Sequence, residues 1–153
     1  TAAALAASLV LMTVGSPQAK KGADVVSGVW VYEERVDAST CEIEQVGTRR
    51  GLLLTIEQGP PAKNAKSKLA IHSEGPTQYS TYTGKYDLAH TRLKVTATAG
   101  KKNVSYTSVI DGKLSSENES RMQGTRDVKI VWSKKGKPVS TCKVLTSFTA
   151  RRM

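Results

Sequence analysis

Aromatic residues are scarce in this chain: they make up 5% of its 153 residues, and Phe148 is the single phenylalanine. A large pocket walled by aromatic rings is hard to build from that stock, so a core must come mainly from Val, Leu, Ile and Ala. Acidic residues are also few, 13 against 23 Lys and Arg, which leaves a net charge of +10. Such a charge favours anionic partners, although it also serves solubility alone.

The chain lacks the short motifs of common catalytic and nucleotide-binding sites. It contains no GxSxG, HExxH, Walker or GxGxxG sequence, and neither of its two histidines, His72 and His90, has the spacing of a metal ligand. We interpret both histidines as surface residues, and we expect no metal site, no cofactor and no enzymatic activity. Basic residues gather at turns without interleaved aromatics, so nucleic acid is not an expected partner.

Charge is absent from residues 1–19, and the run from Ala2 to Val14 is apolar. A membrane span needs about 20 apolar residues, so this run is short for one. It fits the apolar region of a secretory signal peptide, with cleavage after Ala19 preferred; a retained anchor helix is the alternative. After cleavage we expect no stable membrane span. An N-terminal extension over 20–26 and a single domain over 27–153 would then form a secreted or periplasmic protein.

The two cysteines, Cys41 and Cys142, agree with export. An even number of cysteines in an exported chain predicts a disulfide. The bridge would close a loop of about 100 residues, for which the chain-entropy model gives about 4–5 kcal/mol as an upper figure. Two buried free thiols in a reducing compartment are the alternative. Asn103 and Asn118 begin glycosylation sequons, which matter only in a eukaryotic secretory pathway.

From residue 27 onward, short alternating runs separated by turn residues predict an all-β domain. The cleanest alternation covers residues 92–99, with Leu93 and Val95 facing inward. Eight to ten such strands in sequence predict an antiparallel up-and-down β-barrel, with a two-sheet β-sandwich as the alternative. Within this pattern, residues 40–46 read as a separate strand, and Asp111-Gly112 as a hairpin turn.

Basic turns distinguish the two ends of the predicted barrel, because successive turns of a meander alternate between ends. The strand count places Arg49, Arg50, Lys101 and Lys102 at one end, and Lys63 and Lys137 at the other. Charge at both ends argues against one dedicated nucleic-acid groove.

The two ends of the chain resemble the lipocalins and related calycin barrels. Gly28-Val29-Trp30 is similar to the G-x-W of their first strand, and the terminal SFTARR is similar to the end of their last strand. In that family the tryptophan closes the barrel base and an arginine packs over it. The resemblance implies these structural roles for Trp30 and Arg152, with Arg151 as the second choice, and Gly28 lets the chain enter the strand closely.

A barrel of about eight strands can hold one small ligand. We therefore expect a secreted, lipocalin-like, non-enzymatic binding protein for a small apolar or amphipathic ligand, in a cavity lined by Tyr82, Tyr86, Tyr106 and Trp132. The alternative is an extracytoplasmic protein-interaction module, either an enzyme inhibitor or a binder of an anionic envelope polymer. The net charge and the few aromatics, which favour a filled interior, support this alternative.

Overall fold

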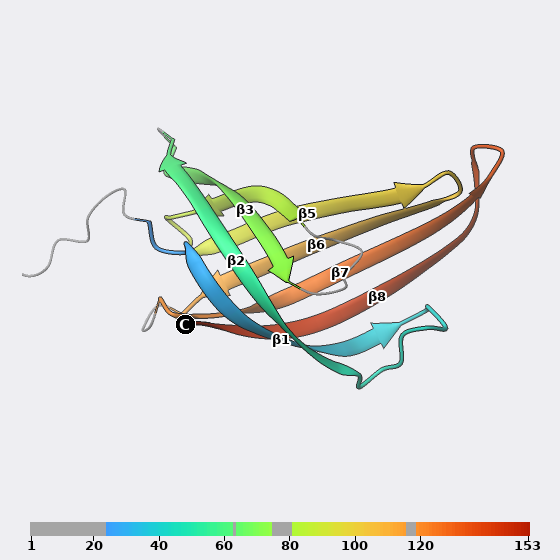
Figure 1. Ribbon diagram of the computed structural model, residues 1–153, viewed down its shortest axis with the longest axis horizontal. Helices are drawn as coiled ribbons and strands as arrows, with labels where there is room; N and C mark the ends of the chain where they lie inside the picture. The colour runs from blue at the N-terminus through green and yellow to red at the C-terminus, as the bar shows by residue number, and fades with distance from the viewer. Residues whose placement is uncertain (1–23, 63, 75–80, 116–118) are drawn as a thin grey trace, which may run out of the picture.

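A computed structural model describes residues 24–62, 64–74, 81–115 and 119–153. The strands are β1 (Gly28–Ser39), β2 (Arg49–Pro61), β3 (Lys66–Glu74), β4 (Thr81–Asp87), β5 (Arg92–Lys101), β6 (Val104–Leu114), β7 (Arg121–Lys134) and β8 (Lys137–Arg152) (Figure 1). Each strand pairs antiparallel with the next, and β1 also pairs with β8, so the sheet closes into a barrel. The predicted all-β up-and-down barrel is confirmed, and the sandwich is excluded.

Alternation along each strand explains how the barrel acquires its core. In β5, Leu93, Val95 and Ala97 are buried, whereas the neighbouring Arg92 and Lys94 are exposed. Successive side chains of a strand point to opposite faces of the sheet, so one parity of every strand faces inward. These inward residues form one hydrophobic cluster that contains contributions from all eight strands.

The barrel has two distinct ends. At one end, which we call the base, β1 begins and β8 finishes, so the start of the folded domain and the C-terminus lie side by side (Figure 1). At the opposite end, which we call the mouth, lie the segment 40–48 and the turns that join β5 to β6 and β7 to β8.

Trp30 is the centre of the base. It is fully buried, and its indole Nε1 donates a hydrogen bond of 2.9 Å to the carbonyl oxygen of Val26. The Arg152 guanidinium lies 5.7 Å from the Trp30 ring centroid, which is the contact that the resemblance implies. Gly28 has φ +128°, and a Cβ there would lie 3.4 Å from Arg152 Cδ. Both the backbone angle and the approach of Arg152 therefore favour glycine at position 28.

The predicted disulfide between Cys41 and Cys142 forms, and it spans the closure of the barrel. Cys142 lies on β8, and Cys41 lies just after β1, its partner across the seam. The predicted strand over 40–46 is wrong, because this segment turns: Glu44 N donates to Cys41 O, and Gly47 N donates to Val36 O. The disulfide also indicates an oxidising, extracytoplasmic compartment.

Replacing both cysteines with serine should lower the free energy of unfolding by about 2–4 kcal/mol, because the bridge restricts the unfolded chain over a separation of 101 residues. Urea denaturation of the oxidised protein, the reduced protein and the Cys41→Ser/Cys142→Ser variant measures this. The reduced protein and the variant should unfold at the same urea concentration. A variant as stable as the oxidised protein would contradict the prediction.

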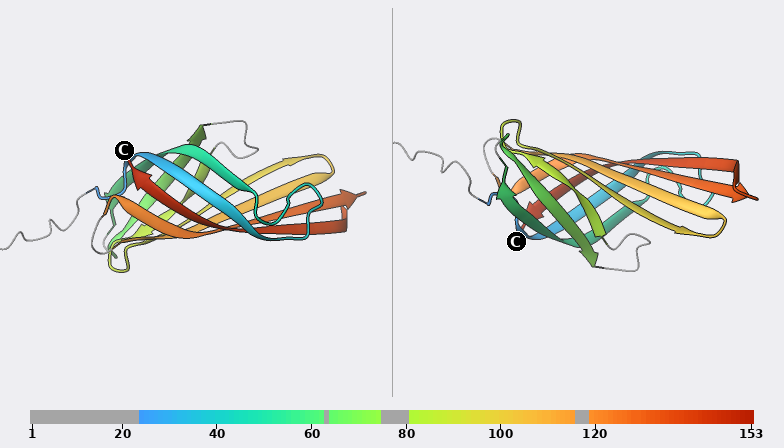
Figure 2. Two further views of the ribbon diagram at one scale, coloured as in Figure 1. Left: turned by 90° about the horizontal axis from the view of Figure 1, so that it is seen from below. Right: turned by 90° about the horizontal axis from the view of Figure 1, so that it is seen from above.

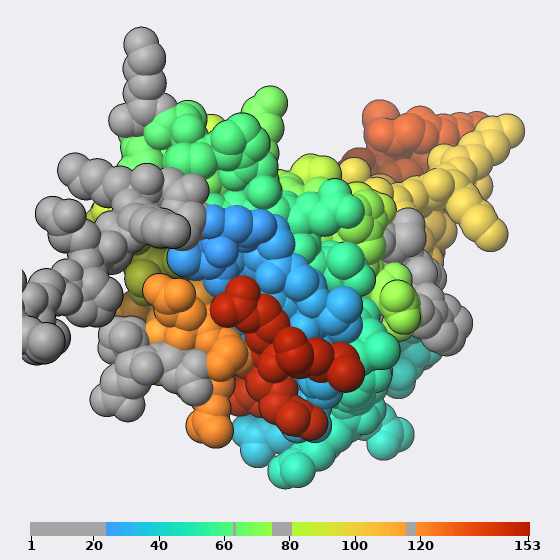
Figure 3. All heavy atoms as spheres, turned by 60° about the vertical axis from the view of Figure 1, so that its left-hand side comes forward, coloured from blue at the N-terminus to red at the C-terminus, as the bar shows by residue number. Residues whose placement is uncertain are grey.

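Figures 1 and 2 both show that the hairpins β5–β6 and β7–β8 extend past the rest of the barrel at the mouth. Strands β7 and β8 have 14 and 16 residues, against 9 and 7 in β3 and β4. The two tips lie side by side, because Ser133 N donates a 2.8 Å hydrogen bond to Asn103 O. Figure 3 shows them as a projection from the body of the molecule.

The predicted turn at Asp111-Gly112 is wrong, because both residues lie inside β6. Asp111 accepts two 2.7 Å hydrogen bonds from Arg92 on β5, and a Cβ on Gly112 would lie 3.0 Å from Met122 and Phe148. The glycine thus serves close packing. Counting a turn there added one strand, so the prediction that Lys137 lies at the end opposite Lys101 is wrong: both lie at the mouth. Lys63 lies outside the described residues.

Candidate functional site

A cavity of about 250 Å³ opens inside the barrel near the mouth, and we call it the mouth pocket. Its apolar lining comprises Leu52, Leu54, Ile110, Val128, Ile130 and Val144, with Ile43 also contributing. Its polar lining comprises Tyr32, Glu34, Glu44, Arg50, Ser73, Tyr82 and Arg126. Towards the base the interior is packed with buried side chains that include Trp30, Tyr86 and Leu93. The interior of the barrel is thus filled with side chains towards the base and hollow towards the mouth.

Glu34 is the centre of the polar lining. It points inward from β1, in phase with Trp30 and Tyr32, and its side chain is 1% exposed. Arg126 from β7 holds both carboxylate oxygens, with Nε donating to Oε2 at 2.8 Å and Nη2 donating to Oε1 at 2.5 Å. The hydroxyl groups of Tyr32 and Thr146 donate hydrogen bonds to Glu34 Oε2, at 2.9 and 3.3 Å. A buried carboxylate needs such compensation, so this ion pair is part of the fold.

Arg50 connects the buried ion pair to the surface of the mouth. Its Nε lies 3.3 Å from Glu34 Oε1, at ion-pair distance although not aligned for a hydrogen bond. Its Nη1 and Nη2 donate to the carboxylate of Glu44 at 3.0 and 2.7 Å. The side chains of Arg50 and Glu44 are 37% and 21% exposed. The mouth pocket therefore carries two arginines and two glutamates, and the Arg50–Glu44 pair is more exposed to solvent than the Arg126–Glu34 pair.

The surroundings of Tyr32 and Arg126 shift the pKa values of both side chains upward. Burial, together with the neighbouring Glu34 carboxylate, raises the pKa of the Tyr32 hydroxyl far above its usual value. Burial alone would lower the pKa of Arg126, but its hydrogen bonds and its attraction to Glu34 outweigh burial and raise it. Tyr32 thus stays neutral and Arg126 stays charged at ordinary pH, which suits binding better than proton transfer.

The four aromatic residues predicted to line one cavity lie in different places. Tyr82 lines the mouth pocket, and its hydroxyl lies 3.0 Å from Ser108 Oγ. Tyr86 is buried in the core on the side of the base, and Tyr106 and Trp132 are half-buried on the projecting hairpins. The structure brings only Tyr82 to the pocket, so the predicted four-residue lining does not form there.

Sequence reasoning missed Glu34, Arg50 and Arg126 as site residues. The signal was present for all three: Glu34 has the parity of Trp30 in β1, Arg50 that of Leu54 in β2, and Arg126 that of Val128 in β7. A charged residue at an inward position indicates either a buried ion pair or a site. The alternation does not reveal that Glu34 and Arg126, which are 92 residues apart, face each other.

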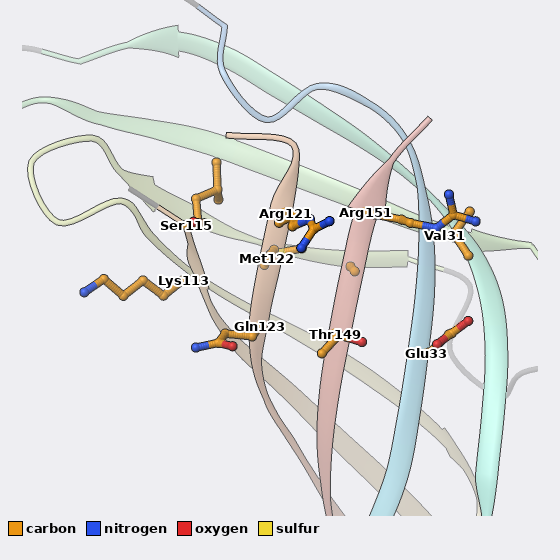
Figure 4. Close-up of a pocket in the computed structure, with 11 residues that line it drawn as sticks. Val31, Glu33, Lys113, Ser115, Arg121, Met122, Gln123, Thr149 and Arg151 are labelled. Carbon is orange, nitrogen blue, oxygen red and sulfur yellow. The ribbon is translucent and has the colours of Figure 1, made fainter. Parts of the chain in front are cut away.

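A second hollow, of about 700 Å³, lies on the outside of the barrel over β6, β7, β8 and β1 (Figure 4). Arg121 and Arg151 stand opposite each other in register on β7 and β8, and Lys113 and Glu33 also line the groove. Most of the side chains that line it face outward from the barrel, whereas ligand sites bury most of the ligand surface. We therefore place the candidate site in the mouth pocket.

Neither histidine takes part in either hollow. His90 Nδ1 lies 3.1 Å from Asp87 and lowers the pKa of that carboxyl group, and His72 Nδ1 lies 3.2 Å from Thr81 Oγ1. Among the described residues, no group of three or more His, Cys, Asp or Glu side chains is placed to hold a metal ion. That same part of the chain contains no helix of a length and apolarity suited to crossing a membrane.

Comparisons of the chain with protein-family models, with curated proteins and with solved structures find no match.

Proposed function

We propose that this protein is a secreted, lipocalin-like, non-enzymatic binding protein that holds a small amphipathic ligand in the mouth pocket. The observation that supports this most directly is the lining: apolar side chains from four strands surround the cavity, and two arginines reach its polar side. Ligand sites have this character, mostly apolar with a few convergent polar groups. The cavity of about 250 Å³ lies below the usual range of about 300–1,000 Å³, so the ligand is small.

The lining also orients the ligand. Its apolar part would pack against Leu54, Ile110 and Val128, deep in the barrel. Its polar head would lie at Arg50, because Arg126 is fully engaged with the buried Glu34 carboxylate. Glu44 now holds Arg50 through two hydrogen bonds and is partly exposed, so a ligand carboxylate could replace that carboxylate in the same geometry.

Octanoate is a suitable probe, with octanol as its uncharged counterpart. Isothermal titration calorimetry should show octanoate binding that weakens at least about tenfold in Val128→Phe, because the larger ring fills the pocket. The matched control is Tyr86→Phe, a change in a buried residue that does not line the pocket. Arg50→Gln should weaken octanoate binding while leaving octanol binding unchanged. Octanoate binding that Val128→Phe leaves intact would place the ligand elsewhere.

A further inference from the structure

The positive charge of this protein is concentrated in the two projecting hairpins. Residues 98–107 and 128–143, which form the mouth-side halves of these hairpins, contain seven of the 23 basic residues and none of the 13 acidic residues. They therefore account for +7 of the net charge of +10. The rest of the chain is nearly balanced, so solubility alone does not explain the distribution.

Five of these lysines form a single patch, which we call the tip lysines: Lys101, Lys102, Lys134, Lys135 and Lys137. All five are exposed, and the hydrogen bond from Ser133 to Asn103 holds the two turns together. Lys134 and Lys137 are also partners in register across β7 and β8. Within the described part of the chain, none of the five forms an ion pair. Like charges held this close repel one another, and an anionic surface would relieve that repulsion.

The shape of the patch selects among anionic partners. The tips form a convex projection (Figure 3), and none of the tip lysines lines the two hollows described above. Single-stranded nucleic acid is bound in a basic groove with aromatic stacking platforms, whereas Tyr106 and Trp132 pack against the core. A convex tip instead meets a broad, flat surface. Val139, beside the tip on β8, is 62% exposed and offers an apolar contact there.

We propose that the tip lysines dock the mouth of the barrel onto an anionic lipid surface. Anionic lipid headgroups attract Lys and Arg side chains held near a bilayer, and clusters of four to eight such residues indicate headgroup binding where they flank a membrane helix or lie on an amphipathic helix. The lysines supply long-range attraction, and the exposed Val139 makes a shallow contact at the headgroups. This docking is independent of ligand binding in the mouth pocket, since it uses none of the residues that line it.

Vesicle co-sedimentation of the full chain tests this proposal. Phosphatidylcholine vesicles with about one-third phosphatidylglycerol should bind the protein at about 0.1 M salt, and the binding should largely disappear at about 1 M salt. Neutral phosphatidylcholine vesicles report any contribution from the apolar residues 1–19. The triple variant Lys134→Gln/Lys135→Gln/Lys137→Gln should bind anionic vesicles at least about tenfold more weakly.

The matched control removes the same charge from the barrel wall. Lys68, Lys85 and Lys94 stand opposite one another in register on β3, β4 and β5, and all three are exposed. The variant Lys68→Gln/Lys85→Gln/Lys94→Gln should bind anionic vesicles nearly as tightly as the unchanged protein. Equal losses in both triple variants would mean that net charge alone drives binding, and would overturn the proposal. Binding to soluble heparin without binding to anionic vesicles would overturn it as well.

Discussion

Trp30→Ala is expected to lower the free energy of unfolding by about 3–5 kcal/mol, the cost of removing a large aromatic side chain from a packed core. Trp30 is fully buried and is among the largest side chains of the core. Its removal leaves a cavity at the base, deprives the Val26 carbonyl of its 2.9 Å hydrogen bond and leaves Arg152 without the ring beneath it. Each of these losses destabilises the folded state, because all three interactions at the base involve the Trp30 side chain.

Two further variants separate the contributions at the base. Arg152→Ala should cost about 0.5–2 kcal/mol, the range of a cation–π contact, and Trp132→Ala should cost less than Trp30→Ala because Trp132 is half-buried. Urea denaturation followed by far-ultraviolet circular dichroism suits all three variants, since the signal comes mainly from the backbone and does not need a tryptophan as its probe. A loss below about 1 kcal/mol in Trp30→Ala would mean that the base closes without it.

The barrel could be predicted from the sequence because the alternation of polar and apolar residues that indicates each strand lies within a few neighbouring residues. Alternation over 92–99 predicts which side of β5 faces inward, and the structure buries Leu93, Val95 and Ala97 on that side. The errors came from turn residues that serve other purposes. Gly112 lies inside β6 because Met122 and Phe148 approach it closely, and a turn motif carries no sign of that approach. The segment after β1 alternates in polarity but turns, so that Ile43 is 80% exposed.

The mouth pocket was less predictable because it depends on register between distant strands. Parity alone places Glu34 and Arg126 inside, but only the closed order of strands brings β1 and β7 to the same pocket, each beside β8. The predicted position of the tip lysines likewise depends on the number of strands that precede them. One additional strand placed Lys137 at the wrong end, and the lysine patch at the mouth could not be seen from the sequence.

Arg126→Met is expected to lower the free energy of unfolding by about 3–5 kcal/mol, since it leaves the buried Glu34 carboxylate without its main partner. Arg126 donates two of the hydrogen bonds that hold Glu34, whose side chain is 1% exposed. Arg50 cannot take its place, because its Nη atoms are held by Glu44 and its Nε is not aligned with Glu34. Methionine preserves much of the side-chain volume, so the loss reports mainly on charge.

Adding Glu34→Gln to Arg126→Met tests that explanation directly. The amide carries no charge, and its oxygen can still accept the hydrogen bond from Tyr32. If the uncompensated carboxylate causes the loss, the double variant should recover most of the stability, because uncharged replacements of a buried ion pair are often close to neutral. Urea denaturation of the two single variants and the double variant gives the coupling between the residues. A double variant as unstable as Arg126→Met would show that Arg126 acts through packing, and the mouth pocket would then depend on the shape of its arginine more than on the ion pair.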